Sequence, residues 1–196
     1  MRGFFYLFNV KIAILRGKPD TMKRILGIAI LGTLMACNQR AEKSKDVADS
    51  TQVNAEVKTD VLIKDDKKSE ILSQYILLKD ELVKSDPVAA QKAASVLKTS
   101  LSNYEGCEPT AEIAAKIASN NNLVAQRKYF TTLSADIIAL FKNAEIEKGT
   151  IYVQHCPMAN KGDGGDWLSV EKKINNPYYG DEMLECGSVV EEIAKK

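Results

Sequence analysis

Between residues 69 and 143, hydrophobic side chains recur every three or four positions, which is the spacing of the buried face of an α-helix. Short polar breaks divide this stretch, so the pattern predicts a series of amphipathic helices. Ser69 is placed to cap the first of them. The predicted inward positions are Ile71, Tyr75, Leu78 and Leu82; Ala90, Ala93, Ala94, Leu97 and Leu101; Ile113 and Ile117; and Val124, Phe130, Leu133, Ile137, Leu140 and Phe141.

Proline and asparagine mark where the later helices begin. Asp86 followed by Pro87 is typical of a cap and a first helical position, and Pro109 is placed to start the third helix. A run of asparagines, residues 120–122, forms a turn and cap before the fourth. Short connections make consecutive helices antiparallel. We therefore predict an all-α fold, an up-down bundle of about four helices.

Residues 150–188 follow a different pattern. Glycine and proline are frequent there, which predicts an irregular segment packed on the bundle rather than another long helix. Trp167, Tyr178 and Tyr179 could pin this segment in place. It holds the only His, the only Trp and two of the four Cys, in two clusters at residues 155–158 and 183–186.

The N-terminal stretch resembles an export signal. From Met22, basic residues, an apolar run too short to span a bilayer and a small residue precede Cys37. Residues 34–37 resemble the lipobox of bacterial lipoproteins, which implies diacylation of Cys37; the alternative is a plain signal peptide with an incidental Cys. We interpret residues 1–36 as a signal peptide whose true start is Met22. Asn38 favours the outer membrane, and hence a periplasm-facing, oxidising compartment.

Residues 37–68 are polar and charged, so we predict a lipidated Cys and a flexible tether. The apolar patch at residues 61–63 could dock on the domain, which is predicted to span 69–196. The formal net charge is +1, and basic residues concentrate before Cys37, which leaves the rest mildly acidic. We therefore expect no nucleic-acid partner.

Sulfur ligands dominate the two clusters. The proline after Cys156 favours an extended chain, which would turn Cys156 and Met158 to one face and His155 to the other. Met183 and Cys186 would share a face of one helical turn. Thiolates and thioethers together select Cu(I) or Ag(I) rather than Zn²⁺. The predicted site is Cys156, Met158, Met183 and Cys186, with His155 as a candidate further ligand.

A structural disulfide explains the same cysteines. In an oxidising compartment Cys156 and Cys186 could close the glycine-rich loop, and the methionines would then be ordinary packing residues. Spacing leaves both interpretations open, and the methionine beside each cysteine favours the metal. Cys107 gives the mature chain an odd number of thiols, which disfavours a fully disulfide-bonded protein.

Several strings carry a family resemblance: residues 155–159, 166–169, 174–180 and 183–187, together with 75–83 and 126–130. They look like the signature of an uncharacterised bacterial periplasmic domain family, DUF3347-like, which is also found fused to periplasmic adaptor proteins of copper/silver efflux systems. The resemblance covers about residues 70–193 and implies a heavy-metal function with copper leading, at Cys156, Met158, Met183 and Cys186. The loop at 160–165 and Cys107 depart from the family pattern.

These observations lead to a binding protein rather than an enzyme. We expect a lipid-anchored Cu(I) or Ag(I) chaperone or buffer that meets copper or silver efflux components and has no small-molecule substrate. The alternative is a helical adaptor with a Cys156–Cys186 disulfide that docks on an envelope complex. An enzyme is not expected, because there is no C-x-x-C and no nucleophile-plus-base spacing. The acidic residues Asp163, Asp166, Asp181 and Glu182 are interpreted as solvated loop positions.

Overall fold

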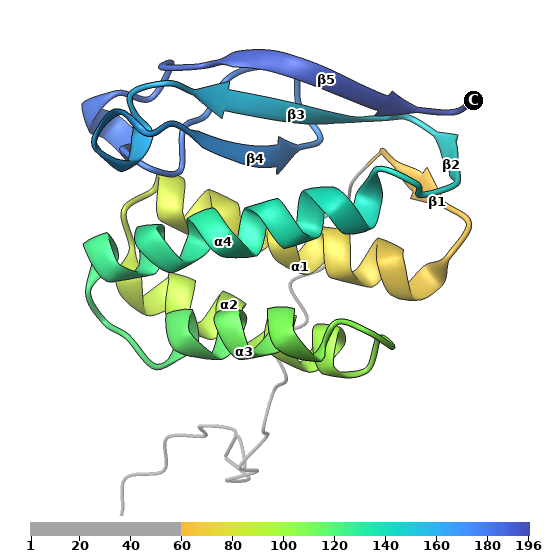
Figure 1. The fold of residues 1–196 in the computed structure, drawn as a ribbon, viewed down its shortest axis with the longest axis horizontal. Coiled ribbons are helices and arrows are strands. Elements are labelled where there is room, and N and C mark those ends of the chain that lie inside the picture. Colours follow the sequence, from red (N-terminus) through yellow and green to blue (C-terminus); the bar gives the residue numbers. More distant parts are fainter. Residues whose placement is uncertain (1–59) are drawn as a thin grey trace, which may run out of the picture. The chain divides into compact units, whose positions relative to one another are not determined.

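In the part of the chain that the structure describes, four helices form the main layers, and a three-stranded sheet lies over them beside a smaller two-stranded one. The computed structural model describes residues 60–196. The helices are α1 (Asp66–Val83), α2 (Pro87–Ser102), α3 (Glu108–Ala118) and α4 (Leu123–Phe141). In Figure 1 the sheet lies over α1 and α4, and α2 and α3 lie on the far side of these two helices.

The predicted helices are confirmed, and side chains cap most of them. Asp86 accepts hydrogen bonds from two backbone amides in the first turn of α2, and Pro87 is its first residue. Asn122 caps α4 by accepting a hydrogen bond from one first-turn amide, that of Ala125. At α1, however, Asp65 accepts the first-turn amides in place of Ser69, so this helix begins earlier than expected.

The all-α prediction is wrong, because the chain after α4 forms strands and a short strand also precedes α1. β1 (Leu62–Ile63) pairs with β2 (Ile146–Lys148), and β3 (Thr150–Cys156) lies between β4 (Gly165–Ser169) and β5 (Ser188–Ala194). All of these pairs are antiparallel. β3 opens with β-branched and aromatic residues, which fit a pleated, half-buried surface better than a helix. The fold is therefore mixed α and β.

The folded unit begins before residue 69. Val61 and Ile63 are buried in the core, and the backbone amide of Lys64 donates to the carbonyl of Glu145 at 3.1 Å. The apolar patch at 61–63 therefore packs on the domain. The expected signal peptide, the Met22 start, the lipidated Cys37 and the tether up to residue 59 lie outside the described residues. Within 60–196, no helix is long and apolar enough to cross a membrane.

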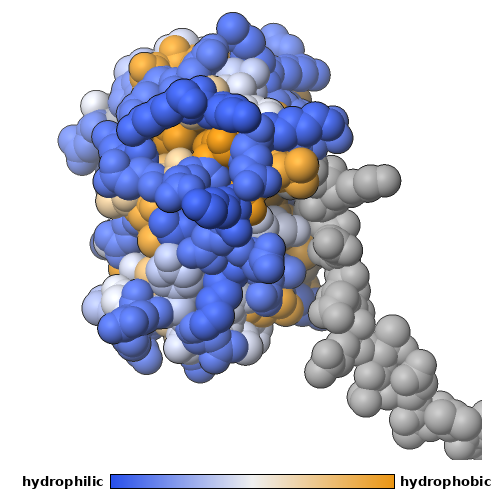
Figure 2. All heavy atoms as spheres, turned by 90° about the vertical axis from the view of Figure 1, so that its right-hand side faces the viewer, coloured by the Kyte–Doolittle hydropathy of each residue, from blue (hydrophilic) through white to orange (hydrophobic). Residues whose placement is uncertain are grey.

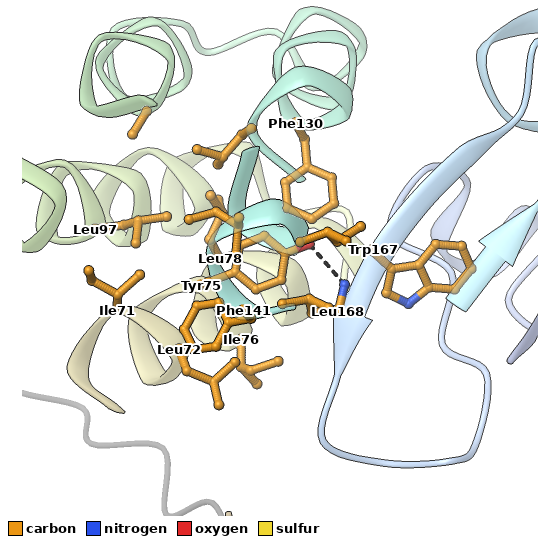
Figure 3. Packing of buried hydrophobic residues seen from close by; sticks show 14 of the residues in the cluster. Ile71, Leu72, Tyr75, Ile76, Leu78, Leu97, Phe130, Phe141, Trp167 and Leu168 are labelled. Carbon is orange, nitrogen blue, oxygen red and sulfur yellow. Dashed lines mark hydrogen bonds between the residues drawn. The ribbon is translucent and has the colours of Figure 1, made fainter. Parts of the chain in front are cut away.

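Tyr75 of α1 joins the helices to the sheet. Its hydroxyl is hydrogen-bonded to Ser134 of α4 at 2.7 Å and accepts the backbone amide of Leu168 of β4 at 3.2 Å (Figure 3). Its ring stacks on Phe130 at 5.5 Å between centroids. Because this amide lies on the outer edge of β4, the sheet docks on the helices by that edge.

Trp167 anchors the segment that follows β4. Figure 3 shows Leu168 pointing toward α1 and Trp167 pointing to the opposite side, as expected for consecutive strand residues. Trp167 is nevertheless fully buried, and its ring meets Tyr178 edge-on at 6.0 Å. Gly187 lies so close that an added Cβ would stand 3.0 Å from the indole. The segment before β5 therefore packs directly on this side chain.

Candidate functional site

Cys156 and Cys186 meet at one end of the sheet. Cys156 ends β3, and Cys186 lies in the turn that leads into β5. Their Sγ atoms are 2.7 Å apart although the residues are 30 positions apart in sequence, and both are free cysteines. Cys156 is fully buried and Cys186 is partly buried. The structure thus brings together the two thiols that both sequence interpretations require.

Hydrogen bonds hold the turn that carries Cys186. The Cys186 amide donates to the Met183 carbonyl at 3.1 Å, and the Asn176 side-chain amide donates to the Cys186 carbonyl at 2.9 Å. The predicted helical turn from Met183 to Cys186 is absent. The 3-10 helix η2 (Gly180–Glu182) ends before it, and Met183 has an extended φ of −149°.

Arg127 of α4 fixes the start of the same segment. Its Nε donates to the Pro177 carbonyl at 2.9 Å, and its Nη2 donates to the Leu82 carbonyl at 3.0 Å and to Ser85 Oγ at 2.9 Å. One guanidinium therefore connects α4, the end of α1 and the segment before β5. The position of Cys186 consequently depends on the helical layers.

Met158 and Met183 lie in the turns beside the cysteines and face solvent, with 53% and 36% of their surface exposed. The predicted extended arrangement of Cys156 and Met158 ends early, because Met158 has helical φ and ψ values of −84° and −15°. The chain turns there into the 3-10 helix η1 (Ala159–Gly162). The Tyr179 hydroxyl donates to the Met158 carbonyl and joins the two methionine-bearing turns.

His155 lies on the other face of β3 from Cys156, as strand alternation predicts. Its Nδ1 is 2.7 Å from Oδ1 of Asp166, its direct partner across β3 and β4. The sequence interpretation of Asp166 as a solvated loop residue missed this pair. The signal that could have found it is an antiparallel register, because opposite residues share a face.

The donor set around the two thiols is soft. Within residues 60–196, no three side chains of His, Cys, Asp or Glu converge to hold a metal ion. Cys107 is buried at the start of α3 and takes no part in the pair. Met158 and Met183, in the adjoining turns, carry the nearest thioethers along the chain, and thioethers suit Cu(I) rather than harder ions.

A pocket at the opposite end of the sheet has a different character. It has a volume of about 590 Å³ and lies between β2 and the last residues of the chain. Figure 2 views this end and shows hydrophobic atoms in a hollow edged by hydrophilic side chains. Both charge signs line it, and Lys64 and Glu145 form an ion pair at 2.7 Å. The charges that line the pocket therefore favour neither an anionic nor a cationic ligand.

The contact between the sulfurs raises the pKa of Cys186. The largest cause is the hydrogen bond with Cys156, burial adds to it, and the nearby Met158 amide opposes it. A raised pKa means that Cys186 stays a neutral thiol over a wider pH range than an ordinary cysteine.

We expect this shift to appear in alkylation rates. In a Cys107→Ser background, the rate at Cys186 should climb only as the pH passes above the ordinary cysteine pKa, because the thiolate is the reactive form. Adding Cys156→Ser removes the largest cause of the raised Cys186 pKa. The rise in the alkylation rate at Cys186 should then begin at a lower pH. Iodoacetamide rates measured by mass spectrometry across a pH series would show this, and identical profiles would contradict it.

Comparison with known proteins gives a match in the helical part. Residues 71–149 match the model of a family described as "Protein of unknown function (DUF3347)". The curated proteins and the solved structures gave no match. The match supports an uncharacterised domain family and ends just before β3. Cys156, Met158, Met183 and Cys186 all follow the matched residues.

Proposed function

We propose that this chain binds Cu(I) or Ag(I) at Cys156 and Cys186 and acts as a metal chaperone or buffer without catalysis. The observation that carries the proposal is the 2.7 Å approach of two free thiols, with a methionine in each adjoining turn. The physiological setting would be copper efflux or homeostasis.

Electrostatics favours a cation between these sulfurs. Two thiolates in contact repel each other, and a cation between them offsets that repulsion. A soft monovalent ion removes this repulsion and releases protons as it binds. The exposed thioethers of Met158 and Met183 are close along the chain and are neutral ligands of the same softness.

Metal binding would require Cys186 to move outward. Metal–thiolate bonds of about 2.3 Å, as for zinc, on either side of one ion separate two sulfurs by more than the present 2.7 Å. Cys156 is fixed in the middle strand, whereas Cys186 lies in a turn. His155, which is held by Asp166 on the other face of β3, would stay outside the ligand shell.

The proposed location is the periplasmic side of the outer membrane, with a lipid on Cys37. The basic and apolar residues from Met22 and the lipobox-like residues 34–37 support it. The resemblance to domains fused to copper/silver efflux adaptors supports efflux components as partners. The lipid on Cys37 would hold the protein at the membrane.

A Cu(I) titration tests the proposal. Protein without the signal peptide, carrying Cys37→Ser and kept reduced and anaerobic, would compete for Cu(I) with a chelator of known affinity. Stoichiometric binding is expected, with loss in Cys156→Ser and in Cys186→Ser because each removes an anionic ligand. Cys107→Ser is the matched control and should bind normally. Unchanged binding in the double variant of Cys156 and Cys186 would refute the assignment.

The same sulfur contact favours a second candidate, a structural adaptor domain closed by a Cys156–Cys186 disulfide that docks on an envelope complex. Thiol titration of the unfolded, unreduced protein, followed by a Cu(I) titration of the reduced protein, separates the two. A structural disulfide predicts no free thiol at these two positions in the protein as isolated, and no Cu(I) binding after reduction.

A further inference from the structure

We infer that Cys156 and Cys186 form a reversible dithiol–disulfide couple that exchanges electrons with other disulfides through Cys186 and closes the metal site when oxidised. The closing of the site rests on the proposed function. The exchange rests on the positions of the two sulfurs alone, which are 2.7 Å apart and unbonded.

The two sulfurs differ in access. Cys156 has no exposed surface and lies in β3, between two partner strands. Cys186 is partly exposed, in a turn between η2 and β5. An incoming disulfide can therefore reach only Cys186, and Cys156 stands directly behind it. This arrangement defines an attacking sulfur and a resolving sulfur.

The chemistry is a pair of exchange steps. The Cys186 thiolate attacks one sulfur of an external disulfide, forms a mixed disulfide and expels one thiolate. Cys156 then attacks Cys186 Sγ and expels the second thiolate, which takes up the proton that Cys156 gives up. The chain loses two electrons to form its disulfide, and the external disulfide gains them as two thiols. The oxidant is a small-molecule disulfide or a disulfide-bearing protein.

Oxidation and metal binding exclude each other at this site. The bond between the sulfurs consumes the thiolates that a soft metal ion needs. The displacements also oppose each other, because a bond draws Cys186 toward Cys156 and an ion between them drives it away. Cys156 is held in the middle strand of the sheet and Cys186 lies in a turn, so Cys186 is the sulfur that moves.

Glutathione disulfide provides the test, in a chain with Cys37→Ser and Cys107→Ser. The reduced protein should form the Cys156–Cys186 bond without retaining glutathione. Cys156→Ser should accumulate a mixed disulfide at Cys186. Cys186→Ser should react with glutathione disulfide at least about tenfold more slowly, because the remaining thiol, Cys156, is fully buried and reacts only when the structure opens. Trp167 fluorescence would verify that both variants are folded, since this residue packs beside Gly187.

The reverse order, with faster glutathionylation of Cys156 than of Cys186, would overturn the exchange. Cu(I) titration of the oxidised and the re-reduced protein tests whether oxidation closes the metal site. Cu(I) binding should be lost on oxidation and restored on reduction. An oxidised protein that binds Cu(I) as tightly as the reduced protein would show that oxidation does not close the site. If the reduced protein never binds Cu(I), the proposed function and the closing of the metal site by oxidation both fail. The glutathione result still shows whether the pair exchanges with external disulfides.

Discussion

Replacing Trp167 with Ala is expected to lower the free energy of unfolding by about 3–5 kcal/mol, the usual cost of truncating a buried aromatic side chain. Trp167 is fully buried, and it packs on Tyr178 and Gly187. Its indole Nε1 has no hydrogen-bond partner. The loss is therefore one of packing and of burial rather than of a polar contact. Because whole domains are stable by about 5–15 kcal/mol, this is a large fraction.

Urea unfolding followed by circular dichroism would measure the change, since the variant lacks the only tryptophan of the chain. Val124→Ala is the control, because Val124 is 77% exposed. A surface change of that kind should shift stability by no more than about 0.5 kcal/mol. Equal losses in the two variants would show that Trp167 does not hold the segment before β5 in place.

The helical part was predictable because its signals are local. Asp86 and Pro87 begin α2 through contacts within one turn, and the apolar stripes follow the helix period. The one clear error is Val124, which was expected to face the core. Gln126 takes the inner position instead and donates to the carbonyls of Pro87 and Asn120 at 2.8 and 2.7 Å. Those acceptors come from another helix and a turn, so the fourth stripe alone could not reveal them.

The sheet was missed because its stability comes from distant partners. The β-branched start of β3 was a usable signal. The pattern fails at Gln154, a fully buried polar residue, whose side-chain amide donates to the carbonyls of residues 171–173. Frequent glycine in the same stretch then favoured an irregular segment. The carbonyls after β4 are what make a buried Gln154 acceptable in the strand, and they come from a segment 17 to 19 residues further along the chain.

The site was predictable in its residues but not in its geometry. Cysteine and methionine spacing identified Cys156 and Cys186, and the structure brings these two together. The expected local geometry at Met158 and Met183 failed, because turns rather than a strand and a helix carry them. Those turns are set by Arg127 and Tyr179, which act across elements far apart in sequence.

Gly180→Ala is expected to disturb both stability and the thiol pair. Gly180 has a φ of +59°, where an added Cβ costs about 1–2 kcal/mol. That Cβ would also stand 2.6 Å from the Val83 carbonyl and 2.5 Å from Ser85 Oγ. Relieving these contacts should add about 1–3 kcal/mol, the usual cost of overpacking. Because η2 leads to Met183 and Cys186, Cu(I) affinity should fall by about 10–100-fold, as when a supporting residue of a metal site is lost.

Gly106→Ala separates the two causes. Gly106 has a φ of +85°, but nothing lies within 4 Å of an added Cβ. It should therefore show the conformational cost alone, with Cu(I) affinity unchanged, in the same urea unfolding and chelator competition experiments. An equal loss of stability in the two variants, with Cu(I) bound normally by Gly180→Ala, would mean that η2 shifts without strain and that its contact with the end of α1 does not position Cys186. A larger loss of both stability and Cu(I) affinity in Gly180→Ala than in Gly106→Ala would instead show that the contact between η2 and the end of α1 positions Cys186.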